Sequence, residues 1–391
     1  MHKKRNRINQ TIALLLSSIA LFLFTHSIIL CGDNEIEEYS LDGIDDPYIF
    51  NQNSAVRIYK INENNELHVR EAAHTDSFMV IVPNETHDTF YFTLQDSLKI
   101  HPACYSASDM IFAVSDIEGN FNALVSLLQG NGIIDENFNW TFGDGHLVLN
   151  GDFVDRGEYV TQMLWFVYKL EKQAHSQNGK VHFILGNHEL MDLKGRTDYA
   201  QDKYVAAAQL ITKEDDPSKA FRYLFSEDSE LGAWLRTKSS IERIGDIIFV
   251  HAGLSPELIT YNFSLQQIND SIRAYLGWQT DDIENDRARF LFRSFGPLWF
   301  RGMVMDYKDY YKKVTEEEVN QILDFYDANA VVIGHTIVDS ISTDYEDKVI
   351  RIDIHQPTKK NTGNAQALLI EDNTFYRVND FGERNKLRID N

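Results

Sequence analysis

The sequence predicts an α/β protein in which a mostly parallel sheet is joined by a second sheet and covered by helices. The first observation is a set of short apolar runs, each ending in a loop that carries carboxylate, amide or imidazole groups. These runs occupy residues 110–115, 147–149, 181–185, 247–250 and 330–333. Helical patterns separate the first three runs, as in βαβ units, whose strands are parallel. Alternating segments near the end of the chain, at residues 349–354, 367–370 and 374–378, are typical of antiparallel strands and are expected to close the second sheet.

Length and composition narrow the class of protein. The chain has 391 residues, of which 43% are hydrophobic, enough for one large domain with additions or for two domains. Its formal net charge is −22, from 59 Asp and Glu against 37 Lys and Arg. Proteins that hold nucleic-acid backbones cluster Lys and Arg, so we expect no nucleic-acid partner.

Residues 1–31 have the composition of an export segment. A basic stretch at residues 3–7 precedes an almost wholly apolar run at residues 11–30. The run ends at Cys31 in a sequence that resembles a bacterial lipoprotein processing site, with Cys31 as the lipidated first residue. Leu30 departs from the small residue expected there, so an uncleaved anchor of about 20 residues is the alternative. We therefore expect an exported protein of the periplasm or cell envelope, attached to the membrane.

Residues 32–107 are expected to form a small β-rich accessory module. Short alternating segments with polar turns are typical of strands, and they carry no cluster of catalytic side chains. A structural or docking role is therefore expected. The chain has only two cysteines, Cys31 and Cys104, which predicts no disulfide framework. Cys104 is expected to be a small buried residue.

Residues 108–391 are expected to form the catalytic domain. Helical patterns follow the first two apolar runs, at residues 122–129 and 159–172. A helical insertion at about 190–245 is interpreted as a cap over the site, and a second insertion lies at about 256–330. In the second insertion, Ser264 with Gln267 and Thr315 with Glu318 have the form of capping boxes, which predict that helices begin there.

The main functional signal is the loop after residues 147–149, where Asp152 follows a glycine and Asp155 and Arg156 come soon after. Ligands of open α/β sheets bind at the carboxyl ends of strands, so charged groups placed there favour chemistry over a solvated surface. The other four runs end in the same way. They deliver Asp116 and Glu118, Asn187 and His188, His251, and His335. We expect all five ends to lie on one side of one sheet.

In this order the motifs resemble those of the calcineurin-like metallophosphoesterases. Residues 151–157 and 186–189 resemble the phosphoprotein-phosphatase branch of that family, and residues 299–302 are similar to a motif of its Shewanella-like phosphatase group. The resemblance covers residues 108–378 and implies a β-sandwich of mixed sheets flanked by helices. Two positions depart from the family pattern: Glu118 stands where the family usually has histidine, and Ala252 where it usually has glycine.

The resemblance implies a site for two divalent metal ions, Mn, Fe or Zn. Asp116, Glu118 and His335 would hold one ion, Asn187 and His251 the other, and Asp152 would bridge both. The chemistry agrees, because two such ions can activate water and clamp a phosphoryl group during in-line attack. As an anionic oxygen ligand in place of an imidazole, Glu118 is expected to favour Mn or Mg over Zn. The alternative is that Glu118 points away from the ions.

The remaining motif residues have implied catalytic roles. His188 would act as general acid and Asp155 would orient it, while Arg156 and Arg301 would bind the phosphate. The first expectation is an exported metal-dependent phosphatase acting on phosphomonoesters, with a phosphorylated protein or a small phosphoester as partner. A nucleotide or dinucleotide polyphosphate hydrolase of the same family is the alternative within the class. A catalytically silent binding protein is the alternative outside it.

Overall fold

The computed structural model describes residues 39–389 apart from residue 54, and residues from Ser40 onward form one compact unit. The predicted export segment at residues 1–31 lies outside the described residues. Within the described part of the chain, no helix combines the length and the apolar composition that a membrane crossing requires.

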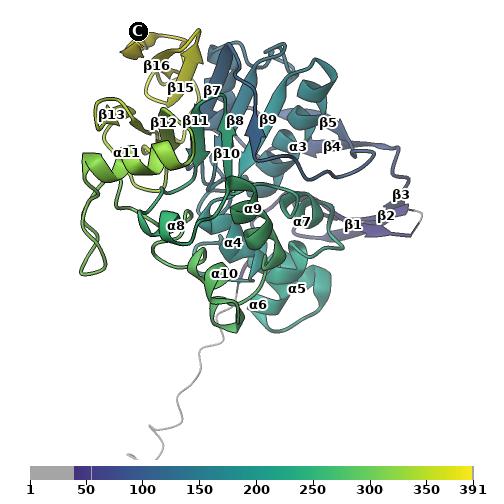
Figure 1. Ribbon diagram of the computed structural model, residues 1–391. Coiled ribbons are helices and arrows are strands. Elements are labelled where there is room, and N and C mark those ends of the chain that lie inside the picture. Colours follow the sequence, from purple (N-terminus) through teal and green to yellow (C-terminus); the bar gives the residue numbers. More distant parts are fainter. Residues whose placement is uncertain (1–38, 54, 390–391) are drawn as a thin grey trace, which may run out of the picture. The chain divides into compact units, whose positions relative to one another are not determined.

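Two six-stranded sheets form the centre of this unit (Figure 1). The first consists, in spatial order, of β17 (Arg384–Ile389), β16 (Thr374–Asn379), β15 (Gln366–Glu371), β7 (Met110–Val114), β8 (His146–Asn150) and β9 (Lys180–Ile184). The second consists of β13 (Ser342–Asp344), β14 (Val349–Arg351), β12 (Ala330–Ile333), β11 (Ile247–Val250), β10 (Ile241–Ile244) and β6 (Cys104–Tyr105). Both sheets are mixed. In the first, β7, β8 and β9 run parallel to one another and β15 pairs antiparallel with β7. In the second, β11, β12 and β14 run parallel to one another and β10 pairs antiparallel with β11.

The two sheets share one hydrophobic core. Buried residues of β7, β8 and β9, such as Val148, belong to the same cluster as Phe249 of β11 and Val332 of β12. The predicted sandwich of mixed sheets is thereby confirmed. The expectation that all five ligand-bearing runs belong to one sheet is wrong, because β11 and β12 lie in the second sheet. The antiparallel β10–β11 hairpin, which turns at Gly245, directs the chain there, and an apolar run alone does not specify which sheet it joins.

Helices flank the sheets and form both insertions. They are α2 (Phe121–Gly130), α3 (Val160–Ser176), α4 (Asn187–Leu193), α5 (Asp202–Thr212), α6 (Pro217–Leu224), α7 (Glu230–Leu235), α8 (Glu257–Thr260), α9 (Leu265–Ala274), the 3₁₀ helix η1 (Thr280–Asp282), α10 (Asp286–Phe290) and α11 (Glu316–Phe325). Both predicted capping boxes are present: the Ser264 and Thr315 side chains accept hydrogen bonds from the third residue of α9 and α11, respectively. These local signals set the two helix starts.

The amino-terminal strands form two small sheets that pack on α3. They are β1 (Asp45–Gln52), β2 (Ala55–Ile61) and β3 (Leu67–Ala72) in one sheet, and β4 (Ser77–Ile81) and β5 (Thr89–Thr93) in the other. Trp165 of α3 donates a hydrogen bond to the Pro47 carbonyl at 2.7 Å and stacks on Phe92 at 4.3 Å. β6, which falls before the predicted boundary at residue 107, is an edge strand of the second central sheet. Cys104 on this edge is exposed, so the expectation of a buried thiol is wrong.

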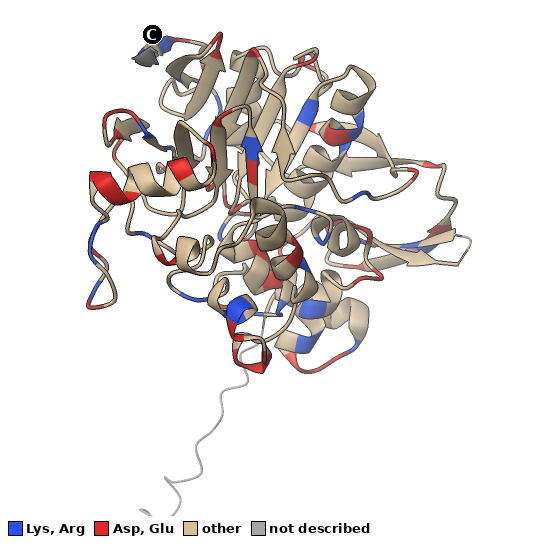
Figure 2. Ribbon diagram, viewed as in Figure 1, with Lys and Arg blue, Asp and Glu red and all other residues tan. Residues whose placement is uncertain are grey.

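Charged residues are distributed over many elements. In Figure 2, Lys and Arg are scattered among several helices and strands of the view and do not gather on one face. Three glutamates, Glu316 to Glu318, occupy the first turn of α11, where acidic side chains favour the positive end of the helix dipole. Part of the acidity therefore lies at a helix end.

Candidate active site

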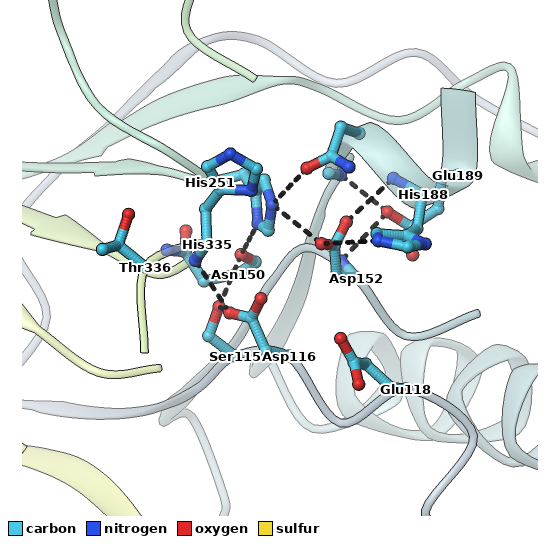
Figure 3. A network of polar contacts seen from close by, with 12 residues as sticks. Ser115, Asp116, Glu118, Asn150, Asp152, His188, Glu189, His251, His335 and Thr336 are labelled. Carbon is cyan, nitrogen blue, oxygen red and sulfur yellow. Dashed lines mark hydrogen bonds and ion pairs between the residues drawn. The ribbon is translucent and has the colours of Figure 1, made fainter. Parts of the chain in front are cut away.

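Five strand ends converge on one cavity of about 950 Å³. β7 and β8 lead into Asp116 and Asp152, and β9 leads into Asn187 and His188 at the start of α4. β11 and β12 of the other sheet lead into His251 and His335. Figure 3 shows the side chains of His188 and His251 directed toward Asp152, with Asp116 and His335 close by. The site therefore forms where the carboxyl ends of two sheets meet, and all ten residues that the motifs single out lie in or directly beside it.

His251 links the ligands of the two sheets. Its Nε2 atom lies 3.1 Å from Asp152 Oδ2 and 3.1 Å from Asn187 Oδ1, and its Nδ1 donates to the Asn150 carbonyl at 3.0 Å. Burial opposes a charge on this ring, but the Asp152 carboxylate raises the pKa of His251 to about 10. A proton on Nε2 satisfies both oxygens here. The same nitrogen and oxygens are a donor set that a divalent cation accepts in place of that proton.

His335 lies beside His251. The two rings are 5.0 Å apart, and Asp152, His251 and His335 can each place a ligand atom within 4.8 Å of the others. The resemblance implied that His335 shares an ion with Asp116 and Glu118. The structure instead groups its ring with His251, while its backbone N–H donates to Asp116 Oδ2 at 3.0 Å. The division of these ligands between two ions stays a prediction.

Glu118, Asp152 and His188 form a second possible cation group by the same 4.8 Å criterion. Glu118 also forms an ion pair with Arg156, whose Nη2 atom lies 3.2 Å from His188 Nε2. The Glu118 side chain therefore points into the site, and the alternative that it points away does not describe this geometry. Arg156 lies at the cavity wall, where it can contact either Glu118 or an incoming anion.

The buried carboxylates of the site fit a cation. Burial raises the pKa of Asp116, and the nearby Asp353 and Asp152 carboxylates raise it further. Burial likewise raises the pKa of Asp353 to about 7. Like charges held this close in a buried site are stabilised by a positive ion between them. Asp353 was not predicted, because it follows an ordinary strand, β14, with no glycine or motif to mark it.

His188 is held by two carboxylates. Its Nδ1 lies 2.6 Å from Asp155 Oδ2, and its Nε2 lies 3.8 Å from Asp152 Oδ2. Burial opposes the charged ring, yet these two carboxylates raise the pKa of His188 above its ordinary value. Glu189 holds the loops after β8 and β9 together. Its buried carboxylate accepts hydrogen bonds from the backbone N–H groups of Asp152, Phe153 and Gly186 at 2.7–3.0 Å.

Arg301 approaches the cavity from the second insertion. Its guanidinium donates hydrogen bonds to the His335 carbonyl and, at 3.2 Å, to Thr336 Oγ1. Trp299 packs edge-on against the His335 ring at 6.1 Å. The first insertion contributes Arg196 and Tyr199 to the same cavity, so both insertions line the site, as a cap requires.

Glycines in the motifs permit the close approach of neighbouring loops. A Cβ atom at Gly186 would collide with the Asp152 carboxylate, and one at Gly334 would collide with Asp116. The backbone itself is also strained. Six predicted site residues have φ angles in the left-handed region, namely Asp116, Glu118, Asp152, Asp155, Arg156 and His335. Such conformations are uncommon for residues with a Cβ, and they cluster at functional sites.

The fold and the site together define a metal-dependent phosphoester hydrolase. The model of the calcineurin-like phosphoesterase family matches residues 110–339, and the chain belongs to this family. The family uses divalent metal ions, and the clustered carboxylate and imidazole groups described above provide ligands for them.

Similar proteins are found among characterised sequences and among solved structures. Shewanella-like protein phosphatase 1 of Plasmodium berghei is 30% identical over 257 residues, 66% of this chain and 67% of its own length. Shewanella-like protein phosphatase 2 of Arabidopsis thaliana is 24% identical over 70% of this chain and 78% of its own. Among solved structures, the cold-active protein-tyrosine phosphatase of a psychrophilic Shewanella species is 32% identical, with a TM-score of 0.77, over 88% of this chain and 99% of its own.

Replacing Glu118 with Ala is expected to weaken the binding of one of two divalent ions while leaving the other in place, because Glu118 offers an oxygen to one group only. Replacing it with His is expected to shift preference from Mn toward Zn. Metal titration by calorimetry measures both effects. The matched control is Glu158→Ala, which removes a nearby exposed carboxylate outside the group. Unchanged affinity and stoichiometry in Glu118→Ala would show that Glu118 is no ligand.

Proposed function

We propose that this chain removes phosphate from phosphoproteins, with phosphotyrosine as the favoured residue. The observation that carries the proposal is the arrangement around one cavity: the His188–Asp155 pair and the guanidinium groups of Arg156 and Arg301 surround the cation-binding groups. General acid, phosphate-binding and metal-binding groups are thus within reach of one phosphoryl group. The names of the relatives, which are protein phosphatases, support this substrate class.

The rim of the cavity supports an aromatic leaving group. Tyr199, Met305 and Ile337 line the cavity and are 45%, 46% and 54% exposed, respectively. Exposed apolar side chains beside a phosphate site provide a surface for an aromatic ring, whereas a serine phosphate has little to place there. The protein-tyrosine phosphatase named among the solved structures supports the same choice.

The side chains of the site divide the work of hydrolysis. Divalent ions bound to the carboxylate and imidazole groups would supply the Lewis acid that activates water and polarises the phosphoryl group. Arg156 and Arg301 have planar guanidinium groups that match phosphate geometry and hold the phosphoryl oxygens. Asp155 binds Nδ1 of His188, and Nε2, which here lies 3.2 Å from Arg156 Nη2, would give a proton to the departing oxygen once Arg156 binds the phosphate.

The metal-loaded protein is expected to hydrolyse phosphotyrosine peptides about tenfold faster, or more, than matched phosphoserine peptides. Phosphate release from each peptide, measured with and without a chelator, tests this expectation. Diadenosine tetraphosphate serves as the competing substrate. Faster turnover of the dinucleotide than of every peptide would replace the proposal with the polyphosphate-hydrolase alternative.

We also propose that the protein is exported and held at the membrane of the cell envelope. The basic and apolar composition of residues 1–31 supports this proposal. If lipid on Cys31 is the anchor, Cys31→Ser is expected to move the full-length protein from the membrane fraction to the soluble fraction of the envelope. Retention of the variant in the membrane would favour the uncleaved apolar run as the anchor, and cytoplasmic recovery of the wild type would overturn export.

A further inference from the structure

A second cavity, of about 280 Å³, shares no lining residue with the active-site cavity. Its walls come from the segment between β5 and β6, the end of α3, and strands β9 and β10 with the residues just before β10. The residue pairing between Ile184 of β9 and Ser239 brings two of these walls together. No motif of the family accounts for this cavity, and the proposed hydrolysis does not use it.

The charges of the second cavity differ from those of the whole chain. Four lysines and three carboxylates line it, although the chain carries a net charge of −22. Two of the carboxylates are already paired. Glu171 accepts from Lys238 at 2.6 Å, and Glu242 lies 2.6 Å from His182 Nδ1. The other three lysines, Lys99, Lys172 and Lys180, form no ion pair with a carboxylate among the described residues. The wall therefore has an excess of positive charge.

Two buried polar groups at the second cavity can form more hydrogen bonds than they do with the described residues. The Lys238 side chain is only 5% exposed. Its ammonium group donates one hydrogen bond, to Glu171, and lies 4.4 Å from the centre of the Trp234 ring, although it has three N–H donors. The neighbouring Ser239 is 2% exposed, and its hydroxyl has no hydrogen-bond partner within the described part of the chain. Burial of a polar group without a partner is unfavourable, so a ligand oxygen that accepts from this hydroxyl would be stabilised.

Part of the lining of the second cavity is apolar. Tyr105, Leu98 and Val181 line it, and the Tyr105 ring packs edge-on against His182 at 4.6 Å. Small-molecule sites combine such apolar walls with a few polar groups that fix the orientation of the ligand. The volume is just below the range of about 300–1,000 Å³ that is usual for these sites, so it suits a small ligand.

We propose that the second cavity binds a small organic anion. Its oxyanion group, a carboxylate or a phosphonate-type head, accepts hydrogen bonds from Lys238 and Ser239, and its planar apolar body lies against Tyr105. Lys172 and Lys180 add positive charge to the lining. Binding requires neither the metal ions nor the catalytic groups, so the proposal stands independently of the phosphatase assignment.

Calorimetric titration with benzoate and with phenylphosphonate tests the proposal and separates the two head groups. The variant Lys238→Met combined with Glu171→Gln removes both charges of the buried pair, so neither is left uncompensated. We expect this variant, and Ser239→Ala to a smaller extent, to bind the preferred probe at least about tenfold more weakly. The reversal Lys180→Glu, at an exposed position that cannot disturb the core, is expected to weaken binding as well.

Arg301→Ala is the matched control, because it alters the active-site cavity alone. Affinity for benzoate, which carries no phosphoryl group, is expected to remain unchanged in this variant. Loss of benzoate binding in Arg301→Ala, wild-type affinity in the Lys238–Glu171 and Lys180 variants, or no binding of either probe at millimolar concentration would each overturn the proposal. Circular dichroism of every variant confirms that the fold is retained.

Discussion

Replacing Asp152 with Asn is expected to abolish phosphatase turnover, by about 10³-fold or more, while the chain stays folded. Asp152 is 2% exposed and touches three partners: His251 Nε2 at 3.1 Å, the His188 ring at 3.8 Å and the His188 N–H at 2.9 Å. An amide can still accept from the His188 N–H. It cannot balance the charge of cations on both sides, and its own N–H groups would face the protonated His251.

The measurement is turnover of p-nitrophenyl phosphate together with metal stoichiometry and circular dichroism. Asp380→Asn is the matched control, because Asp380 is an equally buried carboxylate at 2% exposure and does not line the cavity. This control is expected to keep turnover near that of the wild type. An Asp152→Asn protein that binds two ions and turns over at the wild-type rate would refute the bridging role.

Replacing His188 with Ala is expected to lower the rate by about 10²–10⁴-fold while both ions remain bound. The loss should grow with the basicity of the leaving group, because a poor leaving oxygen needs the proton more. Phenyl phosphate should therefore suffer more than p-nitrophenyl phosphate. Equal losses for the two substrates would contradict the general-acid role.

The pH dependence supplies a second test of the same role. The acid form of His188 is needed, so activity should fall as pH rises through its raised pKa, and His188→Ala should remove that alkaline limb. Asp155→Asn removes a carboxylate that favours the protonated ring. The alkaline limb should then move to lower pH, with metal content unchanged. A profile that does not move would assign Asp155 a purely structural role.

Features that depend on a few adjacent residues could be predicted from the sequence. The helix starts at Ser264 and Thr315 follow from capping boxes, whose hydrogen bonds lie within three residues of each other. The site motifs are equally local: a glycine and a ligand at the end of a buried strand. Asp116, Asp152, Asn187, His251 and His335 could therefore be named before their neighbours in space were known, whereas Arg301 was named through the resemblance to the family.

Features that depend on packing between distant segments could not be predicted from the sequence. The hairpin of β11 with β10 places β11 in a separate sheet from β9, and the parallel pairing of β11 with β12 then places His335 beside His251. Asp353 enters the site because β14 pairs with β12 in parallel, a partnership that no residue of β14 signals. The left-handed backbone at Asp152 and His335 is equally invisible in the sequence, since aspartate and histidine adopt that region more often than most residues but still in a small minority of positions.

Because the site lies where two sheets meet, the distances between its ligands depend on how the core between the sheets is packed. Asp152 and Asn187 move with one layer, whereas His251 and His335 move with the other. A change of side-chain volume in the shared core, at Val148 or Phe249 for example, would alter the spacing of the layers and so the distances between ligands. Core residues that never contact substrate therefore offer a way to tune metal preference and temperature dependence without changing any ligand.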